Sequence, residues 1–230
     1  MKEKIRLDKI LSKSGLGSRN DVKKLIKQGR VTAGGKTAKS ASEKYDPAEV
    51  RLDGQAVNYR EFVYILMNKP AGVISATEDN RHTTVIDLLG DEYASFDMFP
   101  VGRLDIDTEG LLLITNDGVL AHELLSPVKH IPKTYYARLD KKLSGDEVKK
   151  LESGVDIGGY ITKPAQVELC DDGAFITIYE GKFHQVKKMF KAVGATVLYL
   201  KRISMGNLTI PEGLEIGQFA EVSRDVVQSA

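Results

Sequence analysis

The chain has 230 residues, of which 42% are hydrophobic, so it contains enough apolar material for a buried core and is not expected to be disordered. It has no apolar run long enough to span a membrane, and the charged residues 1–9 precede no apolar segment, so we expect a cytoplasmic protein. The single cysteine, Cys170, excludes an internal disulfide, and the four histidines form no HxxxH or HExxH pattern, so no metal site is expected.

The small net charge of +1 hides an uneven distribution. Residues 1–60 carry fifteen Lys and Arg against seven Asp and Glu, a net charge of +8, whereas the remainder carries eighteen against twenty-five, a net charge of −7. A small domain with such an excess is typical of a protein that binds a polyanion, and nucleic acid is the first candidate. A solvated basic surface explains the same charge equally well.

The first sixty residues predict two helices on a small sheet. Apolar residues at helical spacing predict a helix over 6–13 and a second helix that has Ser18 as its N-cap and ends at Gly29. A Gly-Gly turn after residue 33 and an Asp-Gly turn after residue 52 predict two pairs of short strands. We therefore expect a small α/β domain over residues 1–58.

A polar joint near residues 59–61 precedes a second domain, which we place at 61–230. Runs of apolar and β-branched residues predict strands at 62–67, 72–75, 98–104, 110–115, 133–139, 165–170, 174–179, 196–203, 208–210 and 218–222. Helical spacing and caps predict helices at 84–89, 118–125, 184–193 and after the capping box Ser144-Gly-Asp-Glu147. Because strands and helices do not alternate regularly, the chain predicts an α+β fold with a mixed, mainly antiparallel sheet.

The densest group of charges lies between two apolar runs, in the segment from Phe99 to Gly118, and includes Arg103, Asp105 and Asp107. A charged loop held between core strands is a natural functional site. From spacing alone, a polar turn whose aspartates accept backbone hydrogen bonds fits at least as well. A carboxylate pair such as Asp105 and Asp107 also suits a glycosidase or hydrolase, although that function does not explain the basic domain.

The expected helix 184–193 has a buried stripe and a cationic face. The stripe consists of Val186, Met189, Phe190 and Val193, and the neighbouring face carries His184, Lys187 and Lys191. A charged helix face is usually only solvated, so this pattern alone does not establish a site.

The expected strand 133–139 contains two consecutive tyrosines, Tyr135 and Tyr136. Side chains alternate along a strand, so these two tyrosines must face opposite sides of the sheet. One can pack in the core while the other points into a cleft.

Three segments together resemble the motifs of the ribosomal pseudouridine synthases. The run Gly102-Arg-Leu-Asp-Ile-Asp-Thr-Glu-Gly-Leu-Leu-Leu-Ile-Thr-Asn-Asp-Gly118 is similar to the family signature, Lys133-Thr-Tyr135 to its Lys-x-Tyr motif, and Glu180-Gly-Lys-Phe-His-Gln-Val-Lys-Lys-Met-Phe190 to its third motif. The N-terminal segments Arg6-Leu-Asp-Lys, Ser18-Arg19 and Gly29-Arg-Val31 resemble an S4 RNA-binding domain. The variants present look most like the branch that modifies 16S ribosomal RNA at uridine 516.

This resemblance implies a role for each matching residue. It makes Asp105 the nucleophile, Lys187 its counter-ion, and Tyr135 the ring that stacks on the uracil and serves as, or relays to, the base. Arg103 is implied to fill the space left by a flipped uridine or to bind phosphate. Members of the family isomerise uridine to pseudouridine. This isomerisation has no net redox change, so the resemblance implies no cofactor.

We expect the basic domain to bind RNA mainly through phosphates. The residues expected to contact RNA are Arg6, Ser18, Arg19, Lys23 and Arg30, together with His184 in the second domain. The expected partner is 16S ribosomal RNA or an assembling small-subunit particle, and we expect a monomer. The alternatives are a large-subunit ribosomal RNA pseudouridine synthase and a non-catalytic S4-type assembly factor, although the latter does not require Asp105, Tyr135 and Lys187 together.

Overall fold

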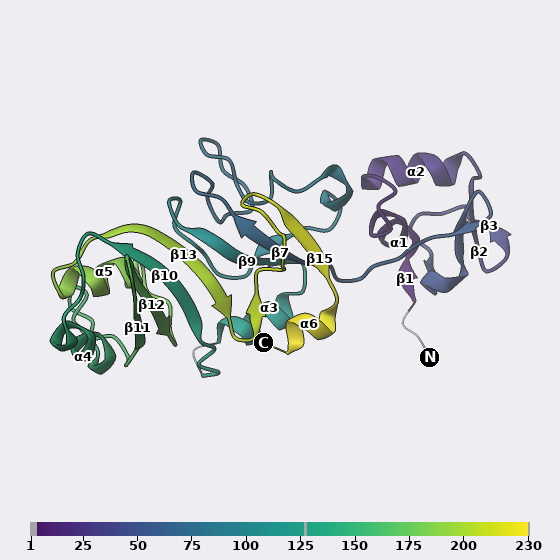
Figure 1. The fold of residues 1–230 in the computed structure, drawn as a ribbon. Helices are drawn as coiled ribbons and strands as arrows, with labels where there is room; N and C mark the ends of the chain where they lie inside the picture. Colours follow the sequence, from purple (N-terminus) through teal and green to yellow (C-terminus); the bar gives the residue numbers. More distant parts are fainter. Residues whose placement is uncertain (1–3, 127, 230) are drawn as a thin grey trace. The chain divides into compact units, whose positions relative to one another are not determined.

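The computed structural model describes residues 4–126 and 128–229, which form two compact units (Figure 1). The first unit contains the residues up to Val63 and the segment Leu89–Met98, and the second contains Tyr64–Leu88 and the residues from Phe99 onward. Within the first unit, the Ser95 hydroxyl donates a hydrogen bond to the Ser12 carbonyl at 2.7 Å. The segment Leu89–Met98 therefore packs with the N-terminal residues, although it lies inside the range that the sequence assigns to the second domain.

The first unit consists of short helices packed on a small antiparallel sheet (Figure 1). Its sheet has the order β3 (Lys36–Thr37), β2 (Val31–Ala33), β5 (Val50–Leu52), β6 (Gln55–Ala56), and β1 (Ile5–Arg6) pairs separately with β4 (Lys44–Tyr45). Its helices are α1 (Leu7–Ser12), α2 (Arg19–Lys27) and the 3-10 turns η1 (Pro47–Glu49) and η2 (Asp91–Tyr93). The core is made of Leu7, Ile10, Leu11, Val22, Ile26, Val31, Ala33, Ala38 and Val50.

Local sequence signals determine where the elements of this unit begin and end. Ser18 caps α2, since its hydroxyl accepts from the Asp21 N–H while the Asp21 carboxylate accepts from the Ser18 N–H. Gly29, with φ of 73°, follows the end of α2. These observations confirm the two helices that the sequence predicts, whereas the β1–β4 pair was not predicted.

The second unit is built on a nine-stranded sheet, counted over the described residues (Figure 1). The strand order is β11 (Gln166–Cys170), β12 (Gly173–Ile178), β10 (Lys133–Leu139), β13 (Val197–Met205), β9 (Glu109–Thr115), β7 (Tyr64–Lys69), β15 (Phe219–Val222), with β14 (Leu208–Thr209) beside β13 and β8 (Phe99–Pro100) beside β9. Only β9 and β13 pair in parallel among these described strands. The expected mixed, mainly antiparallel sheet is confirmed.

The helices of the second unit are α3 (Gly118–Leu125), α4 (Gly145–Ser153), α5 (Gln185–Ala192) and α6 (Arg224–Gln228). Helix α4 contacts the edge strand β11, and α5 contacts β13. The predicted capping box is present, because the Ser144 hydroxyl accepts from the Glu147 N–H and the Glu147 carboxylate accepts from the Ser144 N–H. In the described ranges, no helix combines the length and the apolar composition that a membrane crossing requires.

Three predicted elements are wrong. Residues 72–75 form no strand, because the Ser75 hydroxyl is engaged with the backbone of Leu104. Of the expected strand 98–104, only Phe99–Pro100 form a strand, and Val101 makes one further backbone hydrogen bond to β9 before the loop begins. The expected helix 84–89 is a single turn closed by reciprocal hydrogen bonds between Thr84 and Asp87. At 72–75 and 84–89, side-chain hydrogen bonds hold the backbone in a loop.

Candidate active site

The loop of residues 101–108, between β8 and β9, is anchored to the core beneath it. The Val101 N–H donates to the Leu113 carbonyl of β9 at 2.7 Å. The Ser75 hydroxyl accepts from the Leu104 N–H and donates to the Leu104 carbonyl, each at 3.1 Å. The Thr108 N–H donates to the Asp105 carbonyl at 3.0 Å and closes a turn. These bonds fix the backbone of Asp105, so its carboxylate is presented from a rigid support.

A fully buried lysine, Lys69 at the end of β7, supports the same loop from below. Its ammonium group donates to the carbonyls of Pro70 at 2.9 Å, Asp105 at 3.2 Å and Thr108 at 2.9 Å. Burial lowers the pKa of Lys69 to about 8, although the nearby carboxylates act in the opposite direction. The sequence did not single out this residue. The only available signal was a charged residue just beyond the apolar run that ends at Met67, which is normally read as the exposed end of a strand.

Asp105 and Asp107 converge on Lys187 of α5. The Lys187 ammonium lies 3.1 Å from Asp105 Oδ2 and 2.5 Å from Asp107 Oδ1, and His184 Nε2 lies 3.5 Å from Asp105 Oδ1. The side chains of Asp105 and Lys187 are 25% and 24% exposed, so they are partly desolvated but open to a ligand. The structure therefore brings together three residues that the sequence singles out, Asp105, His184 and Lys187.

The electrostatics favour the charged forms of Asp107 and Lys187. Burial alone would raise the pKa of Asp107, but its hydrogen bond and ion pair with Lys187 outweigh burial and lower it. Burial alone would lower the pKa of Lys187, but its hydrogen bonds to Asp107 and Asp105 and their charges outweigh burial and raise it. The Asp107–Lys187 pair is therefore held in its charged form beside Asp105.

Helix α5 positions His184 and Lys187 because its opposite face is buried. Val186, Met189 and Phe190 are buried, as the helical spacing predicts. His184 is the N-cap residue of α5 and has φ of 52°, a left-handed conformation that residues other than glycine rarely adopt. With the helix packed on its apolar stripe, the face that carries Lys187 is turned to the loop of Asp105.

Tyr135 reaches this end of the sheet through strand pairing. It is buried on β10, opposite Arg202 of β13, and Arg202 is in turn opposite Gly110 of β9. A Cβ added at Gly110 would lie 2.2 Å from the Arg202 carbonyl oxygen, so only glycine permits this approach of β9 to β13. Within the described residues, Lys187 forms an ion pair with Asp105 and His184 lies 3.5 Å from Asp105, whereas Tyr135 is placed by register alone.

Tyr136 faces the other side of the sheet, as the strand alternation predicts. Its ring packs against Phe175, with centroids 5.5 Å apart, and its hydroxyl donates to Asp172 at 2.7 Å. Tyr136, which follows the Lys-x-Tyr motif, is therefore a packing residue.

Buried Arg202 was not predicted from the sequence. Its Nε–H donates to the Leu111 carbonyl at 2.7 Å, and its charge contributes, after burial, to the lowered pKa of Lys133. Arg103, by contrast, is exposed on the loop of Asp105. Beside Arg103, Gly102 adopts φ of 78°, and an added Cβ would lie 3.2 Å from the Leu125 side chain, so α3 lies against the start of this loop.

The predicted RNA contacts of the first unit differ in how they are held. Arg6 forms an ion pair with Asp8 at 2.7 Å, and Arg30 forms one with Asp53 at 2.5 Å. Ser18 is the cap of α2 and thus has a structural role in addition to the expected one. Arg19 and Lys23 lie on α2 and are exposed.

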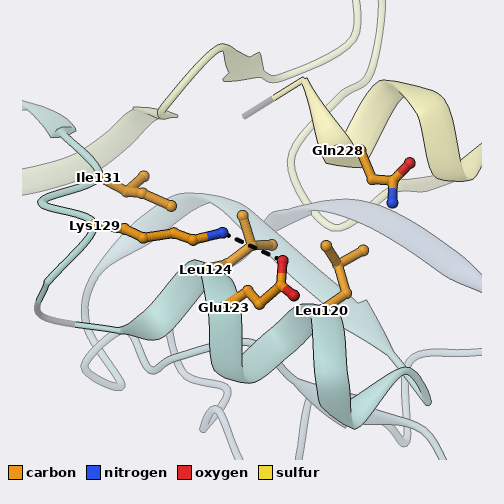
Figure 2. A pocket seen from close by; sticks show the side chains of 6 residues that line it. All are labelled: Leu120, Glu123, Leu124, Lys129, Ile131 and Gln228. Carbon is orange, nitrogen blue, oxygen red and sulfur yellow. Dashed lines mark hydrogen bonds and ion pairs between the residues drawn. The ribbon is translucent and has the colours of Figure 1, made fainter.

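Two pockets of the second unit lie away from the Asp105 cluster. Figure 2 shows a pocket of about 410 Å³ in which Lys129 and Glu123 form an ion pair at 3.2 Å; its lining residues are Leu120, Glu123, Leu124, Lys129, Ile131 and Gln228. A pocket of about 350 Å³ is lined by Thr134, Glu152, Gln166, Val167, Glu168, Phe175 and Thr177. Neither includes Asp105, Tyr135 or Lys187, so these pockets do not mark the carboxylate cluster.

The sequence and the fold are similar to those of known pseudouridine synthases. Residues 63–192 match the model of the family described as RNA pseudouridylate synthase, and residues 5–50 match that of the S4 domain. The chain is 52% identical to an uncharacterized RNA pseudouridine synthase of Bacillus subtilis, over 96% of each chain. It is 39% identical to ribosomal small subunit pseudouridine synthase A of Yersinia pestis, over 98% of this chain and 97% of that one. A crystal structure of a pseudouridylate synthase matches with a TM-score of 0.69 and 31% identity, over 98% and 99% of the two chains.

Proposed function

Since this chain belongs to the RNA pseudouridylate synthase family and carries an S4 domain ahead of its synthase domain, we propose that it converts uridine 516 of 16S ribosomal RNA to pseudouridine, with Asp105 as the nucleophile. The observation that carries the assignment of Asp105 is its position between Lys187 and His184, on a loop fixed from below by Lys69. The Lys187 ammonium, 3.1 Å from Asp105, supplies a counter-charge for a carboxylate nucleophile.

The reaction requires little more than this carboxylate. The bond between N1 of the uracil and C1′ of the ribose breaks, the base turns, a bond forms between C5 and C1′, C5 loses its proton and N1 gains one. Asp105 acts either by attack on C1′ or by supporting elimination at C2′, and both routes return it unchanged. Since atoms and electrons balance within the uridine, no cofactor is proposed.

Tyr135 and Lys187 complete the proposed catalytic set. Tyr135 stacks on the uracil and serves as the base that removes the C5 proton, or relays the proton to that base. Its placement on β10, two strands from the start of β9, is compatible with this role. Lys187 acts as the counter-ion of Asp105, and its pairing with Asp107 keeps it charged and oriented.

Substrate recognition is divided between the two domains, which we place at residues 1–58 and 61–230. A uridine in folded RNA must be flipped out of its stack, and the exposed Arg103 is proposed to fill the vacated space or bind phosphate, with His184 as a further contact. In the first domain, Arg6, Ser18, Arg19, Lys23 and Arg30 are the proposed contacts. Replacing Arg19 and Lys23 by Ser should reduce the slope of log Kd against log salt by about 2, and an unchanged slope would refute this pair of contacts.

The small ribosomal subunit is the proposed target because a relative 39% identical is named for it. We propose that the protein acts in the cytoplasm as a monomer, on 16S RNA or on an assembling particle that contains it. A large-subunit target and a purely RNA-binding role are the alternatives.

Mapping of pseudouridine in ribosomal RNA tests the proposed activity, its target and the need for Asp105. RNA from cells with and without the gene is compared, and cells carrying Asp105→Asn are included. We expect the signal at uridine 516 to be lost without the protein and not restored by Asp105→Asn. Loss at a large-subunit position would instead assign the chain to that subunit. An unchanged map would leave only the RNA-binding role.

A further inference from the structure

Phe183 is an exposed aromatic ring at the edge of the Asp105 cluster. Its surface is 71% exposed, although large apolar side chains are normally buried. Its ring stacks on His184, with centroids 3.9 Å apart and an angle of 19° between the planes. His184 Nε2 lies 3.5 Å from Asp105. The His184 ring therefore lies between the Asp105 carboxylate and the exposed ring of Phe183.

The backbone around Phe183 is held rigidly. The buried Gln185 side chain accepts from the Lys182 N–H at 2.9 Å and donates to Glu180 at 3.0 Å, while the Gln185 N–H donates to the Lys182 carbonyl at 3.0 Å. The left-handed conformation of His184 turns the chain directly after Phe183. Such conformations persist where surrounding contacts impose them, so the ring is presented by a fixed support.

One lysine lies over this ring and another precedes it in the chain, and together they indicate what the ring can bind. The Lys188 ammonium lies 5.2 Å from the centroid of Phe183, and Lys182 lies 4.4 Å from the ring centroid of Tyr160. An apolar protein surface would have to desolvate these ammonium groups without compensation. A nucleotide instead brings a base for the ring and a phosphate for the lysines, which is how unpaired nucleic acid is commonly bound.

We propose that Phe183 is a stacking platform for an unpaired RNA base next to the flipped uridine, a subsite that rests on the proposed function. Flipping a uridine removes a stacking partner from its neighbours and leaves a base face uncovered. Phe183 covers that face, with His184 behind it and Lys182 and Lys188 beside the adjoining phosphates. The subsite thus lowers the cost of keeping the uridine out of its stack.

The test uses the full chain and 16S fragments spanning uridine 516, in which each flanking nucleotide in turn lacks its base. The proteins are wild type, Phe183→Ala, Phe183→Tyr and, as a matched control, Leu169→Ala, which removes a half-exposed apolar side chain from the edge strand β11. Phe183→Ala should weaken binding of the intact fragment about 10-fold, as removal of a stacking ring does. Phe183→Tyr and Leu169→Ala should bind like wild type.

Removing the base at one of these positions should also weaken RNA binding by wild type about 10-fold. It should have no further effect on binding by Phe183→Ala, because the ring on which that base stacks is already absent. The proposal is overturned if Phe183→Ala binds like Leu169→Ala, or if its effect persists at every abasic position. Formation of pseudouridine by wild type is measured separately in the same fragments. If none forms, the proposed function fails, while the Kd values still decide whether Phe183 stacks on a base.

Discussion

Strand β9 is flanked by two aspartates that the structure holds in opposite ways. Asp105, before the strand, faces Lys187 and His184 from another element and keeps a quarter of its side chain exposed. Asp117, after the strand, is buried, accepts from the Tyr64 hydroxyl at 2.8 Å and caps α3 through the Leu120 N–H at 3.1 Å; Arg224 approaches it at 3.8 Å.

The difference between them is the one expected between a structural carboxylate and the proposed nucleophile. The oxygens of Asp117 are occupied by donors that the fold itself requires, so removing them should affect stability. The oxygens of Asp105 face cations and solvent, so its charge is available to a substrate. Both residues lie in the segment that resembles the family signature, and the sequence alone does not distinguish their roles.

Asp105→Asn should have the largest effect of the substitutions considered, and that effect should be on catalysis. The amide keeps the shape of the side chain but cannot act as a nucleophile, so kcat should fall by at least on the order of 10³-fold. Single-turnover formation of pseudouridine measures this loss, and urea unfolding should show a stability close to wild type. Activity near the wild-type level would remove the assignment of Asp105.

Asp117→Ala should have the converse effect. It removes the cap of α3 and the buried carboxylate that accepts from the Tyr64 hydroxyl, so the free energy of unfolding should fall by about 3 kcal/mol. The remaining folded protein should stay active. Asp117→Asn retains an acceptor for the Leu120 N–H and should recover part of this loss. Equal stability of the alanine variant and wild type would contradict the structural role of Asp117.

Lys187→Ala tests the surroundings of Asp105 separately from the carboxylate itself. It leaves Asp105 and Asp107 in place and removes only the cation between them. We expect kcat to fall about 30-fold, a loss of about 2 kcal/mol, with a smaller change in KM. Lys187→Arg should restore part of the activity by restoring the charge. Lys191→Ala, at an exposed lysine of the same helix, is the matched control. If it impairs turnover as much as Lys187→Ala, the effect belongs to the helix charge in general.

Elements specified by adjacent residues could be predicted from the sequence. The caps at Ser18 and Ser144 and the strand β10 are examples, because their hydrogen bonds and alternation are local. The proximity of Asp105 to Lys187 came from resemblance to a family, since no periodicity relates residues so far apart. The supporting role of Lys69 could not be predicted, because it depends on carbonyls of Asp105 and Thr108 that only the folded chain brings to it. For the same reason, the strand expected at 72–75 is a loop bonded to Leu104.

The smallest expected effect is a pH dependence of stability caused by Lys69, the buried lysine that supports the loop of Asp105. Its pKa is lowered by burial to about 8 in the folded protein, against an ordinary value of 10.5. Between these values the unfolded chain binds more protons at this site than the folded chain, so the free energy of unfolding should rise with pH, by no more than about 1.4 kcal/mol per unit. Below pH 8 both states are protonated, and the cost of burying the charge is fully present.

Lys69→Met removes this titration while filling much of the same space. Urea unfolding of both proteins from pH 7.5 to 9.5 should show wild type gaining stability relative to Lys69→Met, by roughly 1 to 2 kcal/mol across the range. Other lysines and tyrosines titrate in both proteins and cancel in the difference. A constant difference would mean that the Lys69 amine keeps its ordinary pKa, and that the carbonyls of Pro70, Asp105 and Thr108 fully replace the water it loses on folding.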